Sequence, residues 1–248
     1  MIGCDCPVCT SGDSKLIRTR SSIHLQTPEC SLLVDSGPDL REQALREKIT
    51  QVDAVLYTHA HLDHITGFDE LRAFCWHRDS PLPLYGSSDC LDEIKRMFAW
   101  AFLPTNTYKG YIKPYPIETQ GPFSIGQLTI TPIPVIHGSM PTQGYRFDYP
   151  NTPAIAYLPD VKTIPKASRE MLENIPILII DALHHREHPS HMNFPEALKT
   201  SAKLGASETY LTHLSHELDP REVQSELPEN VHFAHDGLKL TFPLTATT

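Results

Sequence analysis

Four side chains that could bind metal ions lie within six residues, in the run His59-Ala60-His61-Leu62-Asp63-His64. In an extended stretch His59 and His61 point the same way and can hold one metal ion. A turn into a following helix can direct Asp63 and His64 to a second ion nearby. Imidazole nitrogens suit zinc, iron or manganese, and a carboxylate favours harder ions. We interpret the run as a two-metal site; the alternative is a solvated, histidine-rich turn.

A second group of potential ligands lies near the start of the chain, where Cys4, Cys6 and Cys9 place three thiols within six residues. Three thiolates and one imidazole form a closed tetrahedral zinc site. The remaining cysteines are scattered, at positions 30, 75 and 90, so the cluster fits a cytosolic metal site better than a set of disulfides. The fourth ligand must come from elsewhere in the chain. Three free thiols near a flexible end are the alternative.

Apolar runs and helical stretches alternate along the chain, and these elements must position the candidate ligands. The predicted strands are 31–35, 53–58, 127–136, 153–158, 177–180 and 208–211, and the predicted helices are 39–48, 88–102, 165–173 and 195–204. No linker or repeat interrupts them, which predicts a single domain over 1–248 that begins with the cysteine segment 4–9. The prolines are expected to mark loops and to confine nearby strands to sheet edges. They include positions 81, 83, 104, 114, 116, 132 and 134.

Several predicted strands end at or just before an acidic residue or a histidine. These residues are Asp35, His59, His137, Asp160, Asp181 and His213. A strand that emerges from a core delivers its last side chain to one edge of the sheet, where loops can gather several such side chains. We therefore expect the functional site at that edge.

Composition and charge limit the function classes. The 248 residues are 40% hydrophobic, enough for a full core, and the formal net charge is −9. Nucleic-acid binding is not expected, because that affinity comes mainly from clustered Lys and Arg. No export signal is recognisable, and the longest apolar run, 97–103, has seven residues, far short of a membrane span. We expect a soluble, cytoplasmic protein without a membrane partner.

The histidine-rich run resembles the HxHxDH signature of the metallo-β-lactamase superfamily. Later positions match that family's other ligands in the expected order: His137 in Val-Ile-His-Gly, Asp160 in Tyr-Leu-Pro-Asp and His213 in Tyr-Leu-Thr-His. The resemblance implies one divalent ion on His59, His61 and His137, a second on Asp63, His64 and His213, and Asp160 between the two. The ions would be manganese or zinc, with iron as a further option. It also implies an α/β (α+β) fold of the four-layer αββα sandwich type, with Asp35 orienting a ligating histidine.

The segment Gly-Cys-Asp-Cys-Pro-Val-Cys resembles the PhnP phosphodiesterase branch of that superfamily. There the matching histidine follows the last active-site histidine by three residues, which is His216 in this sequence. This implies a structural zinc on Cys4, Cys6, Cys9 and His216. The branch also has a histidine that contacts the substrate phosphate, for which His191, in the His-rich stretch 184–193, is the best match.

The resemblance implies a hydrolase, most naturally a phosphodiesterase that acts on small cyclic phosphodiesters through a metal-bridging hydroxide. Asp63 and His191 would be its catalytic residues, with His191 neutralising an oxyanion or protonating the leaving oxygen. The expected partners are a small-molecule phosphodiester and a second copy of the chain in a homodimer, and no organic cofactor is expected. The alternatives are a non-catalytic module like those of coenzyme PQQ biosynthesis, and a thioesterase or β-lactam hydrolase.

Overall fold

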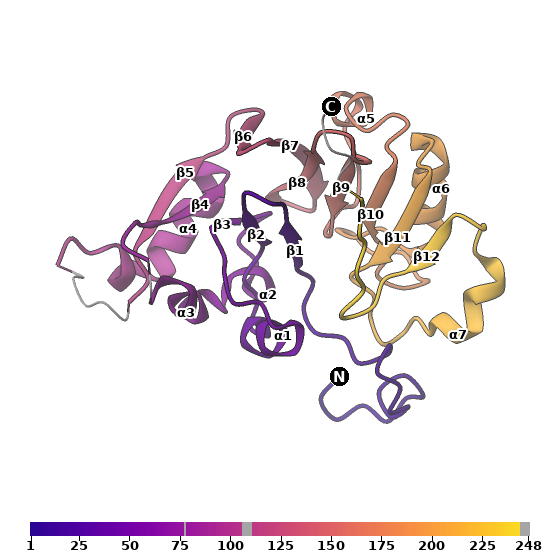
Figure 1. The fold of residues 1–248 in the computed structure, drawn as a ribbon. Helices are drawn as coiled ribbons and strands as arrows, with labels where there is room; N and C mark the ends of the chain where they lie inside the picture. The colour runs from indigo at the N-terminus through magenta and orange to yellow at the C-terminus, as the bar shows by residue number, and fades with distance from the viewer. Residues whose placement is uncertain (77, 106–110, 244–248) are drawn as a thin grey trace. The chain divides into compact units, whose positions relative to one another are not determined.

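The computed structural model describes residues 1–76, 78–105 and 111–243. The chain divides into two compact units: the first unit is Arg20–Gln127, and the second unit is Met1–Thr19 together with Leu128–Thr248. Each unit has its own strands and helices (Figure 1). Each also has its own hydrophobic core. The assignment of 1–248 to a single domain stays a prediction.

The first unit contains a five-stranded sheet in the order β1-β2-β3-β4-β5. The strands are β1 (Ile23–Gln26), β2 (Ser31–Val34), β3 (Ala54–Leu56), β4 (Leu82–Gly86) and β5 (Pro114–Glu118). β1 is antiparallel to β2, and the other pairs are parallel. All residues of β2 and β3 are buried, as expected for strands inside a parallel sheet. A further short strand, β6 (Phe123–Ile125), lies near the end of this unit.

Helices follow the strands of the first unit. They are α1 (Leu40–Glu47), α2 (Leu62–Ile65), α3 (Arg72–Cys75) and α4 (Ser88–Met97), with the 3₁₀ helices η1 (Phe68–Leu71) and η2 (Ala99–Phe102). Ser87 caps α4 by accepting a hydrogen bond from the amide of Cys90. Phe68 and Phe98 stack with ring centroids 4.4 Å apart in the core. The core therefore holds α2 and α4 on the sheet that carries the histidine-rich run.

The second unit contains six strands in the order β12-β11-β10-β9-β8-β7. They are β7 (Leu128–His137), β8 (Met140–Asp148), β9 (Ile155–Leu158), β10 (Ile177–Asp181), β11 (Glu208–Thr212) and β12 (Val231–Phe233). β7 and β8 form an antiparallel pair and β8 is antiparallel to β9, whereas β9 to β12 run parallel. The carboxyl ends of β7, β9, β10 and β11 therefore meet at one edge.

The helices of the second unit are α5 (Lys166–Glu170), α6 (Phe194–Leu204) and α7 (Pro220–Val223), with η3 (Gln224–Glu226). α6 packs on β10 (Figure 1). Asn193 and Glu196 form a capping box at its start, and Gly205, at φ 66°, ends it in the left-handed conformation. These caps fix where the preceding histidine-rich loop ends.

The predicted α+β class is confirmed, and each unit supplies strands and helices of the kinds that make up the αββα sandwich. All six predicted strands and all four predicted helices are present, with ends that differ by a few residues. The helix predicted at 88–102 is divided, because Phe98 adopts φ −112° and ψ 36° between α4 and η2. Among the described residues, no helix combines the length and apolar character that crossing a membrane requires.

The expectation about prolines is wrong in part. Pro83 lies inside β4, between two neighbouring strands, and Pro132 and Pro134 lie inside the long strand β7 and do not mark a loop. The pairing of β4 with β3 begins only at Leu84, so Pro83 need not donate to β3. Prolines two residues apart direct their missing N–H groups to the same side of a strand, which leaves β7 able to pair with β8 along its length. The two prolines of β5 lie on an edge strand, as expected.

Candidate metal centre

The histidine-rich run follows β3 at the carboxyl edge of the first unit's sheet. β2 and β3 run parallel, so Asp35 and Thr58 leave the sheet at the same edge. The Thr58 hydroxyl donates to Oδ2 of Asp35 at 2.8 Å and therefore accepts from Nδ1 of His59 at 3.0 Å. With the Nδ1 proton placed in this way, Nε2 of the buried His59 is the atom available as a ligand. It lies 2.9 Å from Nδ1 of His61.

Asp35 also orients His64. Its Oδ2 lies 2.8 Å from Nδ1 of His64, and its Oδ1 accepts the amide of Thr58 at 2.9 Å. Burial raises the pKa of Asp35, against the opposing effect of the adjacent His64. Nε2 of His64 lies 3.8 Å from Oδ2 of Asp63 on the same helix. The contact between Asp35 and His64 is the one that the sequence predicts, and it directs Nε2 of His64 toward the side of Asp63.

In the second unit, imidazole rings surround a buried carboxylate. Oδ2 of Asp160 lies 3.5 Å from Nε2 of His213 and 3.7 Å from Nε2 of His137. The same oxygen lies 3.9 Å from Nε2 of His191. His137 is positioned by a 2.7 Å hydrogen bond from its Nδ1 to the carbonyl oxygen of Ser190. The second unit thus brings together three predicted metal ligands and the predicted phosphate-contacting histidine.

Asp181, the last residue of β10, positions His191. Its Oδ2 lies 2.7 Å from Nδ1 of His191 and accepts the amide of Val161 at 3.1 Å. Burial raises the pKa of Asp181 well above its ordinary value. The ring of His191 stacks on that of His213, with centroids 4.8 Å apart. His191 is therefore held from two sides, with Nε2 directed toward Asp160.

The other histidines of the loop have different surroundings. Nδ1 of His188 accepts the amides of Ser190 and His191, both at 3.3 Å, and burial lowers its pKa. The ring of His185 packs edge-on against Phe194 at the start of α6. His184 is buried, with its ring 5.7 Å from that of His188. Of the four histidines that compete for the phosphate-contacting role, His191 is the one whose ring nitrogen approaches Asp160.

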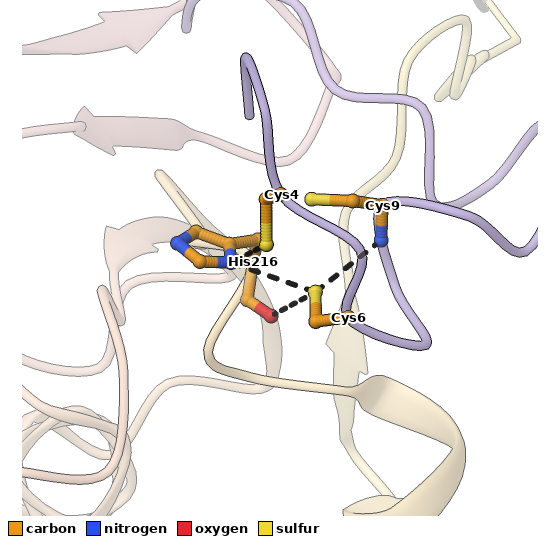
Figure 2. A group of neighbouring side chains, drawn as sticks. All are labelled: Cys4, Cys6, Cys9 and His216. Carbon is orange, nitrogen blue, oxygen red and sulfur yellow. Dashed lines mark hydrogen bonds between the residues drawn. The ribbon is translucent and has the colours of Figure 1, made fainter.

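The cysteine segment docks against the loop after β11 within the second unit. Figure 2 shows the side chains of Cys4, Cys6, Cys9 and His216 converging. Nδ1 of His216 lies 3.4 Å from Sγ of Cys4 and 3.5 Å from Sγ of Cys6. The Cys9 amide donates to Sγ of Cys6, and this bond together with that from His216 lowers the pKa of Cys6 to about 6. This lowered pKa favours the thiolate form of Cys6, which is the form that binds zinc.

The donor sets fit metal ions. Nitrogen or oxygen ligands of a tetrahedral metal lie about 3.4 Å apart, and ligands at right angles about 3.0 Å apart, at the usual bond length of about 2.1 Å. The separation of 3.5 Å between Asp160 and His213 and that of 2.9 Å between His59 and His61 match these values. For a sulfur and a nitrogen on zinc the expected separation is about 3.6 Å, close to the separations around His216. All four cysteine-site ligand atoms lie within 4.8 Å of one another.

Two functional residues were missed by sequence reasoning. The sequence marks Asp181 only as a strand end, although an acidic residue after a buried apolar run is itself a signal. Arg18 gives no signal, because its role depends on carbonyl groups nearly 200 residues away. Its guanidinium donates to the carbonyl oxygens of Ser215 at 2.5 Å and Leu218 at 3.1 Å. It thereby supports the loop that carries His213 and His216.

Comparisons with known proteins agree with these observations. A family model described as the beta-lactamase superfamily domain matches residues 31–214. A crystal structure of a new diphosphatase from the PhnP family is 39% identical in sequence, with a TM-score of 0.87, and the match covers 98% of this chain and 92% of that one. The resemblance to the PhnP branch is therefore confirmed.

Two further relatives are more distant in sequence or in length. The chain is 37% identical over 243 residues to the octanoyltransferase of Porphyromonas gingivalis, which covers 96% of this chain but 48% of that protein. The chain thus spans about half the length of this curated relative. The Zn²⁺-bound PqqB from Methylobacterium extorquens has a TM-score of 0.79 at 19% identity, covering 97% of this chain and 95% of that one. At that identity the likeness shows the fold alone. Because the family model runs from the start of β2 to the residue after His213, the chain belongs to the metallo-β-lactamase superfamily, whose fold implies the binding of divalent metal ions.

Proposed function

We propose that this chain is a metal-dependent phosphodiesterase that acts on small phosphodiesters, cyclic ones included. The observation that carries the proposal is the buried carboxylate of Asp160 with imidazole nitrogens of three histidines within 3.9 Å of it, in a chain of a metal-dependent hydrolase superfamily. The 39% identity to a PhnP-family diphosphatase supports phosphoryl rather than acyl chemistry.

The proposed ligand sets are those that the sequence resemblance implies. One ion would bind His59, His61 and His137, and the other would bind Asp63, His64 and His213, with Asp160 as a ligand of both. Divalent ions bound there would supply hydroxide at neutral pH and neutralise charge on the phosphoryl oxygens. Manganese, zinc or iron fits these donors. Cys4, Cys6, Cys9 and His216 would hold a separate structural zinc, because four protein ligands leave no open position.

Hydrogen bonds to the Nδ1 atoms of three histidines decide which ring nitrogen of each faces the site. Asp35 holds Nδ1 of His64, and Thr58 holds Nδ1 of His59, so that the Nε2 atoms would be the metal ligands. Asp181 holds Nδ1 of His191. His191 can then carry a proton on Nε2 and deliver it to the leaving oxygen. As an imidazolium it would also offset the charge of an anionic substrate in this acidic chain.

A turnover screen tests the proposal. The purified protein, loaded with manganese or zinc, is incubated with bis(p-nitrophenyl) phosphate, with 2′,3′-cyclic nucleotides, with a thioester and with a β-lactam, and metal content is measured in parallel. We expect release of nitrophenolate and opening of the cyclic diesters, and loss of both after removal of metal with a chelator. Turnover of the thioester or the β-lactam alone would contradict the proposal.

Acyl chemistry is the second candidate, favoured by one observation. The Porphyromonas gingivalis relative is named an octanoyltransferase, and octanoyl transfer involves an acyl ester or thioester. Only about half of that relative aligns with this chain, and its name does not assign the transferase activity to either half. An octanoyl thioester in the screen separates the two candidates. The proposed substrate is a small molecule. We also propose that the chain forms a homodimer, which light scattering would test.

A further inference from the structure

Lys162 joins the segment that follows β9 to the start of α6. Its Nζ lies 2.8 Å from both Oε atoms of Glu196, the third residue of α6. Oε2 of Glu196 also accepts the amide of Asn193 in the capping box, at 3.0 Å. The exposed fractions of the two paired side chains are 24% for Lys162 and 39% for Glu196. One partly buried carboxylate therefore holds both the lysine and the residue that precedes α6.

Backbone hydrogen bonds already join the segments that this ion pair connects. The amide of Met192, the residue after His191, donates to the carbonyl oxygen of Val161 at 2.8 Å. The Lys162 amide donates to the carbonyl oxygen of Ile136, near the end of β7, at 2.7 Å. The ion pair thus adds a charged side-chain link to a junction that the main chain forms.

The lysine lies where a cation is unfavourable for the helix. The start of an α-helix carries partial positive charge, which favours acidic side chains and disfavours basic ones. Asn193 and Glu196 complete the cap of α6 without Lys162. Burial opposes the ionisation of Glu196, but hydrogen bonds from Lys162 and from the Asn193 amide outweigh it and lower the pKa of Glu196. The helix therefore has no need of Lys162, and its contribution concerns the segment after β9.

The two joined segments carry residues of the candidate site. Asp160 lies two positions before Lys162, and His191 lies two positions before Asn193. Oδ2 of Asp160 is 3.9 Å from Nε2 of His191. Oδ2 of Asp181 contacts both segments, because it accepts the amide of the residue after Asp160 and lies 2.7 Å from Nδ1 of His191. A shift of one segment against the other would change how His191 faces Asp160.

We propose that the ion pair of Lys162 and Glu196 positions Asp160 and His191 relative to each other. This inference rests on the proposed function, in which Asp160 binds both metal ions and His191 delivers a proton to the leaving oxygen. Lys162 and Glu196 would act through these two residues, without contact with metal or substrate, and are positioning residues.

Two substitutions remove the ion pair from opposite sides. Glu196→Gln keeps a capping box, which glutamine can form, but removes the charge that holds Lys162. Lys162→Met removes the cation. Each should lower kcat for bis(p-nitrophenyl) phosphate about tenfold and change KM less than about twofold, because a misplacement of about 1 Å can cost about 100-fold. Metal content should stay at the parent value. Lys162→Arg, which can bind the carboxylate through two N–H groups, should keep most of the parent kcat.

Two controls distinguish positioning from simple stabilisation. Ser201→Ala removes a buried 2.6 Å hydrogen bond between α6 and Thr209 of β11, and should lower Tm at least as much as Glu196→Gln while keeping the parent kcat. Lys166→Ala removes an exposed lysine of the same unit and should change neither quantity. A kcat that follows Tm in all four substitutions, or a parent kcat in both ion-pair variants, would overturn the inference.

Proton NMR of the zinc-loaded protein separates this inference from the proposed function, because it requires no substrate. The Nδ1 proton of His191, in its hydrogen bond with Asp181, should give a downfield resonance that His191→Ala removes. Glu196→Gln and Lys162→Met should shift this resonance, whereas Ser201→Ala should not. A shifted resonance in a protein without turnover would support the positioning role and refute only the phosphodiesterase. An unchanged resonance in both ion-pair variants would overturn the inference at any rate of hydrolysis.

Discussion

At the scale of single residues, the candidate centre depends on which nitrogen of each imidazole carries the proton. Four histidines have Nδ1 in a hydrogen bond with a protein oxygen, and in each the Nε2 atom is left to face the site. The pairs are His59 with Thr58, His64 with Asp35, His137 with the Ser190 carbonyl group, and His191 with Asp181. Asp35 and His213 adopt positive φ, 64° and 56°, at a cost of about 1 kcal/mol each. Unfavourable backbone conformations of this kind cluster at functional sites.

The first prediction concerns Asp63. Asp63→Ala should remove about one metal equivalent. It should lower the rate of hydrolysis at least about 100-fold, because even the loss of a residue that only orients a metal ligand lowers activity by up to about 100-fold. The fold should persist, because the Asp63 side chain is partly exposed. Metal analysis, turnover and thermal melting are measured together. Asp69→Ala, which removes an exposed carboxylate from η1, is the control; parent metal content in Asp63→Ala would rule out the two-metal assignment.

The second prediction separates chemistry from metal binding at His191. His191→Ala should lower kcat for a phosphodiester about 100-fold, the size of a lost general acid, and leave metal content near that of the parent. His185→Ala on the same loop removes a ring that packs on Phe194 and should keep kcat. Nε2 of His191 lies 3.9 Å from Oδ2 of Asp160, and these two residues with His213 form a group that could hold a metal ion. Loss of a metal equivalent in His191→Ala would therefore show that His191 binds a metal ion rather than the substrate.

At the scale of elements, strands with strong apolar runs were predictable and the others were not. β2 and β3 are buried throughout, and burial on both faces produces an uninterrupted apolar run. β4 was missed because prolines at 81 and 83 read as loop signals. β8 was missed because its polar residues and Gly144 resemble a turn-rich segment. Gly144 fits there because a Cβ would lie 2.2 Å from Cδ2 of Leu158, a contact that no local pattern reveals.

The candidate site was predictable to a similar degree. The candidate ligands and their order along the chain could be named from the sequence, because histidine and aspartate seldom gather so densely after an apolar run unless they bind metal. Apart from Asp35, which the resemblance implies, the partners that orient the candidate ligands could not be predicted, because no local pattern shows which side chain reaches them. Ser190 contributes a backbone carbonyl group, which any residue could provide. Arg18 reaches its partners across 197 and 200 sequence positions.

The third prediction concerns the loop after β11. Arg18→Ala removes hydrogen bonds from a half-buried guanidinium to the carbonyl oxygens of Ser215 and Leu218, which should cost about 2 kcal/mol of unfolding free energy. His213 precedes this loop, so active-site metal affinity should fall as well. Cobalt-loaded protein provides the readout, because a displaced histidine ligand changes the visible absorption of cobalt. Arg18→Lys should restore part of the stability.

If Arg18→Lys restores the stability but not the cobalt spectrum, the guanidinium itself positions the loop. Lysine carries the same charge but lacks the planar fork of N–H donors. An unchanged spectrum in Arg18→Ala would limit Arg18 to a stabilising role. Arg169→Ala on α5 is the control, because it removes an exposed arginine of the same unit.

At the scale of the whole molecule, the cysteine segment joins the two ends of the sequence within the second unit. Cys4, Cys6 and Cys9 meet His216 more than 200 positions later, and Thr19 adds hydrogen bonds from its amide and hydroxyl to Asp236. The N-terminal segment therefore depends on the end of the chain for its structure. A metal bound at such a junction contributes its binding energy to folding.

The last prediction follows from this junction. Cys6→Ser should lose about one zinc per chain and lower Tm by about 5 °C, which for a chain of this size corresponds to about 2 kcal/mol. Activity should fall less than in Asp63→Ala, since the effect reaches His213 only through the loop. Protein prepared in medium with manganese should still retain about one tightly held zinc, because thiolates select zinc over manganese. Asp5→Asn, an exposed neighbour in the segment, is the control and should keep both zinc and Tm. If Cys6→Ser keeps the parent's zinc and Tm, the four side chains converge without holding a metal, and the stability of the N-terminal segment rests on Arg18 and Thr19 instead.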